Sequence, residues 1–196
     1  MIHQIRGKTM ETTALYVEYV VIGMETLSWI VMSIYIIVGN SVKEIIKYCI
    51  SNILPSIIAI ILCYVLGLVT DRIADKLFEK RRKNIKDNFE FQAQTSIAVW
   101  EDYSNSSYAN FTLSRIRILR STTINSVFIG LTSSFLAYNY FGIKLLLFVL
   151  FICICMFFGS NSAHKNLLKN YYKKTNALEN ETKNRNGKDK SIILPQ

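Results

Sequence analysis

Four long stretches of the sequence contain neither lysine nor arginine, and each is mostly apolar. They are Thr12–Asn40, Ile50–Thr70, Ser121–Ile143 and Leu145–His164. The hydrocarbon core of a bilayer is ~30 Å thick, so an α-helix crosses it with about 20 residues at 1.5 Å per residue. Each stretch reaches that length. The sequence therefore predicts an all-α membrane protein with four transmembrane helices.

The basic residues are distributed unevenly between the segments outside these stretches. Of the 23 lysines and arginines, only Lys43, Lys47 and Lys144 lie in the two connections on one side of the predicted bundle. All the others lie in the two tails and in the long connection Asp71–Arg120. Because cytoplasmic connections of membrane proteins are enriched in lysine and arginine, this bias predicts a multi-pass protein of the cell (inner) membrane with both termini cytoplasmic.

The long connection predicts helices that continue out of the bilayer. From Asp71 to Tyr103 there is no proline or glycine, and apolar residues recur at helical spacing as far as Trp100. Ser104–Ser107 breaks this pattern, and a second helix is expected from about Asn110 into the third apolar stretch.

These patterns define two parts of the chain. Residues 1–174 are predicted to form the four-helix transmembrane domain, with a cytoplasmic helical insertion at about 71–120. Residues 175–196 are polar and rich in asparagine and lysine, and we expect a disordered tail.

Turn residues predict where the helices begin and end. Gly39–Ser41 is a helix stop after the first span, and Ser41–Ser51 is a short amphipathic link. Pro55 fits the first turn of the second span, where its missing N–H does no harm. Asn139–Lys144 is so short that the third and fourth spans are expected to form an antiparallel hairpin.

Two carboxylates, Glu18 and Glu25, lie in the first apolar stretch. They are seven residues apart and share a helix face to within ~20°. An ionised side chain inside the bilayer costs roughly 2.5–3.5 kcal/mol on insertion scales and usually faces a bundle interior or a cavity. One interpretation is an intramembrane polar site for an ion or proton, with Asn125 of the polar third stretch as a third member. The other places Glu18 at the headgroups and has Glu25 protonated or bonded to serine and threonine of that stretch.

Small residues recur every four positions in three of the stretches. The third stretch carries the clearest ridge, at Ser126, Gly130 and Ser134. Such ridges let helix backbones approach closely, which drives helix association in lipid. The ridge either packs within one protomer or forms a contact between copies in a homo-oligomer.

A dense basic patch flanks the membrane in the long connection. Its first reading is anchoring to the bilayer and to anionic lipid headgroups, which attract lysine and arginine near the surface. Its second is docking of a cytoplasmic protein partner with an acidic face. Nucleic acid is the least favoured partner, because no recognised binding fold accompanies the patch. The patch consists of Arg72, Lys76, Lys80, Arg81, Arg82, Lys83, Arg115, Arg117 and Arg120.

No pattern in the chain predicts catalysis, a metal site or a cofactor. The two histidines, His3 and His164, lie outside the predicted core. Cys153 and Cys155 would point ~200° apart on a helix, with no histidine or carboxylate nearby in the sequence. The chain has no P-loop, no dinucleotide-binding glycine pattern and no Ser-x-x-Lys motif. We therefore expect a protein that is not an enzyme.

The preferred interpretation is a non-enzymatic inner-membrane protein that acts by oligomeric assembly and by recruiting a cytoplasmic partner. The composition, rich in Ile, Asn, Lys, Tyr and Phe and poor in Pro and Gly, is typical of AT-rich bacterial coding sequence. This makes a bacterial stress or antiviral (phage) defence system a natural setting. The alternative is a small ion channel or carrier that uses Glu25 and the polar third span.

Overall fold

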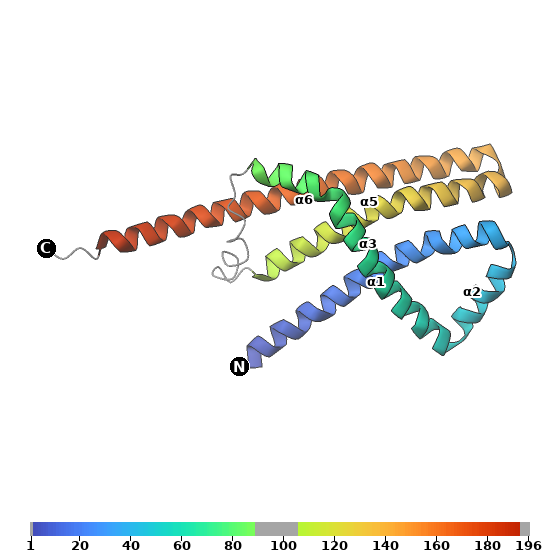
Figure 1. Cartoon of the computed structure of the whole chain (residues 1–196), viewed down its shortest axis with the longest axis horizontal. Coiled ribbons are helices and arrows are strands. Elements are labelled where there is room, and N and C mark those ends of the chain that lie inside the picture. Colours follow the sequence, from blue (N-terminus) through green and yellow to red (C-terminus); the bar gives the residue numbers. More distant parts are fainter. Residues whose placement is uncertain (1, 89–105, 193–196) are drawn as a thin grey trace.

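The computed structural model describes residues 2–88 and 106–192, and every regular element in these two ranges is an α-helix. The all-α prediction is confirmed. The five described helices, four of them long, are joined by very short connections at residues 39–40, 52 and 142 (Figure 1). They are α1 (Ile2–Val38), α2 (Ser41–Ser51), α3 (Ile53–Asp87), α5 (Ser106–Phe141) and α6 (Ile143–Ile192).

The predicted turn residues end and begin the helices as expected. Gly39 has φ +75° and Gly142 has φ +77°, a left-handed conformation that glycine adopts without the steric cost of a Cβ. Gly39 follows α1 and Gly142 separates α5 from α6. Pro55 lies in the first turn of α3. The link over 41–51 is the separate helix α2, and α5 and α6 form the predicted antiparallel hairpin (Figure 1).

The two ends of the molecule differ. One end, called the turn side here, carries α2 and the Gly142 turn, whereas the opposite end, the terminal side, carries both chain termini (Figure 1). The last residues of α3 and the first residues of α5 also lie on the terminal side. The predicted helix between Asn88 and Tyr103 lies outside the described residues.

Three of the helices are long and apolar enough to cross a membrane: Leu15–Val38, Ile53–Asp87 and Ile143–Asn180. Their large apolar side chains point outward; Ile53 is 82% exposed and Phe151 is 64% exposed. Such a surface is costly in water and favourable against lipid tails. The three helices therefore support the prediction of a membrane protein.

The third predicted span, in α5, is not among these three helices. Its serine, threonine and asparagine residues lower its hydropathy, and several of them are buried against neighbouring helices, including Ser121, Thr123, Asn125 and Ser126. A helix whose polar face is covered by protein needs less apolar surface to lie in a bilayer. That α5 crosses the membrane stays a prediction.

Glycines allow the closest approaches between helices. A Cβ on Gly23 of α1 would lie 1.6 Å from the carbonyl oxygen of Cys63 in α3, and one on Gly67 would lie 1.9 Å from that of Tyr19. The two backbones therefore touch where α1 crosses α3, and no larger residue fits there. Close contact of this kind maximises dispersion between helices in lipid, where no hydrophobic effect drives them together.

On the terminal side, α3, α5 and α6 continue beyond their apolar segments and pack together. The apolar core of this region, called the terminal-side cluster, consists of Ile85, Ala109, Ile116, Leu168, Tyr171, Tyr172 and Leu178. The expectation of a disordered tail from Thr175 differs from the structure, in which α6 continues to Ile192. Thr175 is fully buried and Leu178 joins the cluster, which stabilises helix in a segment whose composition alone suggests disorder.

Candidate functional site

A layer of polar side chains lies between α1, α3 and α5, within the segments that carry the outward apolar surface. We call it the polar layer. Its members come from three helices that are far apart in the sequence, and most are almost fully buried. They are Glu25 and Thr26 of α1, Thr70 of α3, and Thr122 and Asn125 of α5.

The carboxylate of Glu25 accepts hydrogen bonds from two α5 side chains. The Thr122 hydroxyl lies 2.8 Å from Oε1 and 3.0 Å from Oε2, and Asn125 Nδ2 lies 3.1 Å from Oε2. Both carboxylate oxygens thus have partners within the protein. The structure brings Glu25 and Asn125 together, as the sequence suggested for a polar site, and it does so through a threonine and an asparagine of the third predicted span.

Asn125 is the centre of the layer, with 1% of its surface exposed. Its Oδ1 accepts from the indole Nε1 of Trp29 and faces the hydroxyl of Thr26, both at 3.3 Å. The Thr26 hydroxyl also lies 2.9 Å from that of Thr70, which brings α3 into the network. A buried amide is costly unless it is satisfied, and here both ends of the Asn125 side chain have partners.

A second set of buried polar residues joins α5 to α6. The Thr123 hydroxyl donates to that of Ser160 at 3.0 Å. Ser121, two residues before Thr123, is fully buried. His164 is 2% exposed and makes an edge contact with the ring of Phe78, 5.1 Å between centroids. The expectation that His164 lies outside the core was wrong, because α3 covers this side of α6 with Phe78.

Glu18 does not belong to the polar layer. It is buried at the terminal end of the apolar segment of α1 and forms an ion pair with Arg117 of α5, 3.3 Å between Oε2 and Nε. The seven-residue spacing therefore places Glu18 and Glu25 against the same helix, α5, but with different partners.

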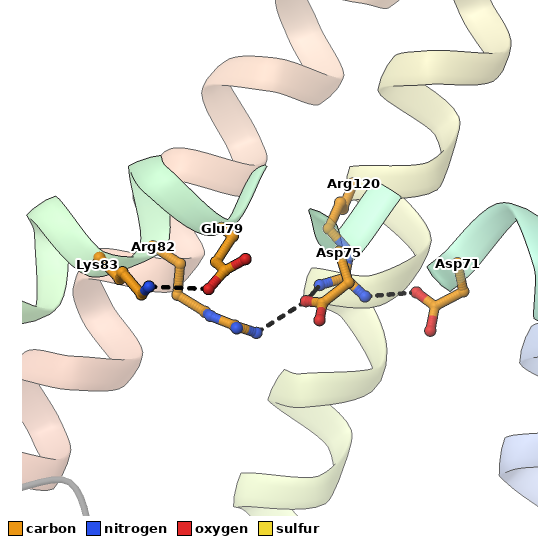
Figure 2. Close-up of polar contacts among 6 residues, drawn as sticks. All are labelled: Asp71, Asp75, Glu79, Arg82, Lys83 and Arg120. Atoms are coloured by element: carbon orange, nitrogen blue, oxygen red, sulfur yellow. Dashed lines mark hydrogen bonds and ion pairs between the residues drawn. The ribbon is translucent and has the colours of Figure 1, made fainter. Parts of the chain in front are cut away.

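Next to this pair lies a larger group of charges, the arginine cluster. Figure 2 shows Arg120 of α5 reaching two carboxylates of α3, Asp71 and Asp75. Arg120 Nη2 is 2.5 Å from Asp71 Oδ1, and its Nη1 contacts Asp75, which also binds Arg82 Nη1 at 2.8 Å. The side chains of Arg120 and Asp71 are each only 9% exposed. Two arginines face two aspartates, so the cluster is neutral.

Most cations of the predicted basic patch contact another side chain of the protein. Arg82, Arg117 and Arg120 pair with carboxylates, and Lys83 pairs with Glu79 at 2.9 Å. Arg81 donates to Asn161 of α6, and the guanidinium of Arg115 stacks on the ring of Phe111. The remaining three, Arg72, Lys76 and Lys80, are exposed on α3. Lys83 and Arg115 are exposed as well, so five of the nine cations of the patch lie at the surface.

The ridge of small residues on α5 faces α6 of the same chain. A Cβ on Gly130 would lie 3.1 Å from Cβ of Cys153, and Ser126 and Ser134 are buried. This arrangement corresponds to packing within one protomer. The small residues of α6 behave differently, since nothing lies within 4 Å of a Cβ built on Gly159.

Within the described ranges, no three histidine, cysteine or carboxylate side chains gather in a way that could hold a metal ion. The four cysteines, Cys49, Cys63, Cys153 and Cys155, are free thiols. What the arrangement can do chemically is hold helices in register through buried hydrogen bonds and ion pairs. No protein-family model, curated protein or solved structure matches the chain.

Several residues of the polar layer and the arginine cluster were not singled out from the sequence. Thr26 and Thr70 are lone threonines in apolar runs, and nothing local marks them as partners. Asp71 and Asp75 bind Arg120 across the bundle, and no pattern along their own helix marks them as its partners. One signal in the sequence could have found this pair. Asp71 is the first carboxylate after the apolar run of α3, and Arg120 is the last arginine before the Ser121–Ile143 stretch of α5.

Proposed function

We propose that the chain is a non-enzymatic, four-span inner-membrane protein that presents a rigid helical platform to a cytoplasmic partner. The terminal side is the cytoplasmic side in this proposal, because it carries almost all the lysines and arginines. The platform consists of the parts of α3, α5 and α6 that pack in the terminal-side cluster.

The positions of charged residues support a crossing by α5 as well as by its neighbours. Counted from the turn side, the first charged residues are Asp71 on α3 and Arg120 on α5. On α6, Lys144 lies at the turn itself, and the next charged residue is Lys165. Each lies about 20 residues from the turn side, which is ~30 Å of helix and the thickness of the hydrocarbon core. α5 also packs against α1 and α6 along this length. A helix held between spanning helices at the same depth would cross with them.

The topology is testable with reporter fusions. Fusions at Asn84 and after Gln196 are expected to report the cytoplasm, and a fusion at Tyr48 in α2 the periplasm. Periplasmic signals at both Asn84 and the site after Gln196 would overturn the orientation. A split result between Asn84 and Gln196 would remove α5 from the membrane.

The observation that carries the platform proposal is the continuity of three helices from the apolar segments into a packed apolar core. The terminal-side cluster joins Ile85 of α3, Ile116 of α5 and Leu168 of α6 with little exposed surface, while cations cover its outside. A body of this kind has a fixed position relative to the membrane. The exposed cations next to the cluster residues of α5 and α6 include Arg115, Lys169 and Lys173.

Recruitment predicts a stoichiometric complex with a protein that has an acidic face. The full chain, purified in detergent from its own host, is expected to carry such a protein, detected by the mass of the complex. Arg115→Glu with Lys173→Glu should remove the partner, because like charges repel across an interface. Lys144→Glu on the turn side is the control. A complex lost equally in the control, or one insensitive to the double reversal, would contradict the proposal.

Oligomeric assembly belongs to the same proposal, and the mass measurement reports it too. The α5 ridge at Gly130 is occupied by α6, so a contact between copies would use another face. Only the composition supports a stress or phage-defence setting, and the neighbouring genes test it: a gene for a soluble cytoplasmic partner is expected beside this one. The channel alternative depends on Glu25 and is tested through that residue in the Discussion.

A further inference from the structure

A groove of about 710 Å³ lies between α3 and α6 at the level where the apolar segments end. Three of its lining residues are cationic: Lys80 and Arg81 from α3 and Lys165 from α6. Asn161 and Ser162 of α6 add polar groups beside them. Neither the polar layer nor the terminal-side platform uses this groove as a whole.

Among the described residues, the three cations have no acidic partner. Within the described part of the chain, no carboxylate lies in ion-pair distance of Lys80, Arg81 or Lys165. The nearby carboxylates of α3 are already engaged, Asp75 by two arginines and Glu79 by Lys83. Three positive charges on one groove therefore repel each other and favour an anion between them.

The groove is apolar at one end and cationic at the other, in the same order on both helices. On α6, Phe158 is 63% exposed and precedes Lys165 by seven residues, or ~10 Å. On α3, Leu77 is 66% exposed and precedes Lys80 and Arg81. The apolar end points toward the membrane-spanning segments and the cationic end points away from them.

Arg81 is already held in position. Its Nη1 donates to Asn161 Oδ1, and its guanidinium lies 5.0 Å from the centre of the Phe78 ring. The remaining donors of the guanidinium are available, and the amide nitrogen of Asn161 is free to donate as well. A cation fixed in this way loses little conformational entropy on binding a phosphate, which strengthens the interaction.

We propose that this groove binds the phosphate headgroup of an anionic glycerophospholipid, with Lys80, Arg81 and Lys165 around the phosphate and an acyl chain along Leu77 and Phe158. Basic pockets between transmembrane helices at the cytoplasmic level recognise phospholipid headgroups in this manner. A lipid fits the groove better than a free phosphate, because only a lipid covers its apolar end. The assignment rests on the proposed membrane level of Lys165 and is independent of partner recruitment.

The full chain is purified in detergent and offered phosphatidylglycerol or phosphatidylcholine, and retained lipid is counted by native mass spectrometry. One phosphatidylglycerol per protomer is expected to resist removal. Exchange of all three cations for glutamine should weaken its apparent affinity about 10- to 100-fold. The matched control removes three cations outside the groove, as Arg72→Gln, Lys76→Gln and Lys169→Gln, and should change the affinity less than about twofold.

A single reversal covers the case in which the triple variant does not fold. Lys165→Glu changes an exposed side chain, so the helical content should stay unchanged while phosphatidylglycerol retention falls. Lys169→Glu, one turn further along α6, is its control. Equal retention in groove and control variants would overturn the lipid site.

An arm with inorganic phosphate separates a lipid site from an anion site. Inorganic phosphate at the same concentration as the lipid should not displace phosphatidylglycerol. If phosphate displaced it, the groove would be a site for a free anion and the lipid assignment would be overturned. Failure of the lipid site leaves the fusion-reporter result intact. Wrong topology would instead appear in the reporters, whatever lipid is retained.

Discussion

The membrane-spanning half and the terminal-side half of this molecule are built from the same helices with opposite polarity. In the spanning half, Asn125, Thr26 and Thr70 are inside and residues such as Phe151 point outward. In the terminal-side half, Leu168 and Ile116 are inside and lysines point outward. The exposed surface is apolar in the first half, as lipid tails favour, and rich in lysine in the second half, as water favours.

The change from one polarity to the other falls at the arginine cluster. Arg120 is the first charged residue of α5 counted from the turn side and is paired within the protein, whereas Lys165 of α6 lines the groove. Buried charges are stable only when their partners are in place, so this level depends on specific contacts more than either half does.

The largest expected effect therefore comes from Arg120→Gln. It leaves Asp71 buried without a counter-charge, which costs about 3–5 kcal/mol. The midpoint of thermal unfolding in detergent should fall by ~10 °C or more. Arg115→Gln, exposed on the same helix, should have no comparable effect. Adding Asp71→Asn to Arg120→Gln should recover part of the loss, and no recovery would mean that the orphaned carboxylate is not the cause.

A pair of leucine substitutions on α6 tests the inverted polarity directly. Leu168 is 3% exposed in the terminal-side cluster, and Leu168→Ala should cost about 2–4 kcal/mol through lost contacts and a cavity. Leu147, 62% exposed in the apolar segment, should tolerate alanine within about 0.5 kcal/mol. Thermal unfolding in detergent measures both. Similar costs at the two positions would contradict the comparison.

A pair of glycine substitutions tests how the spanning half is packed. At Gly23 a methyl group would overlap the backbone of Cys63, so Gly23→Ala must push α1 and α3 apart and should cost about 1–3 kcal/mol. Gly159→Ala has nothing within 4 Å and should be neutral or slightly stabilising. Detergent unfolding midpoints and yields of monodisperse protein compare the two. A neutral Gly23→Ala would mean that the crossing is looser than the structure has it.

The sequence predicted the elements well because local chemistry decides them. Glycine at positions 39 and 142 marks the two turns, and the apolar runs mark three helices that can span a membrane. The contacts between helices were not predictable in the same way. Asp71 and Arg120 are separated by 49 residues, and no local rule selects this pair over a partner on the same helix. The start of the segment beyond Thr175 follows the same rule: its composition predicts disorder, whereas α6 continues through it and Leu178 packs in the terminal-side cluster.

The smallest expected effect belongs to Glu25→Gln. Glutamine keeps an acceptor for Thr122 and Asn125 and cannot ionise. The free energy of unfolding in detergent should therefore change by less than about 1 kcal/mol. If the polar layer only holds α1 against α5, the variant should insert, assemble and function as the native chain does. If Glu25 carries an ion or proton, the same variant should insert normally and lose activity, and native protein in liposomes should conduct an ion that the variant does not.

We expect function to be retained in Glu25→Gln. The carboxylate oxygens are both bonded within the protein, and the neighbouring polar groups are bonded to one another, from Thr26 and Thr70 to Trp29 and Asn125. Groups closed on each other in this way stabilise helix packing and leave few donors and acceptors for a passing ion. Flux through the native protein that Glu25→Gln abolishes would reverse this assignment and make the polar layer a conduction path in place of a structural one.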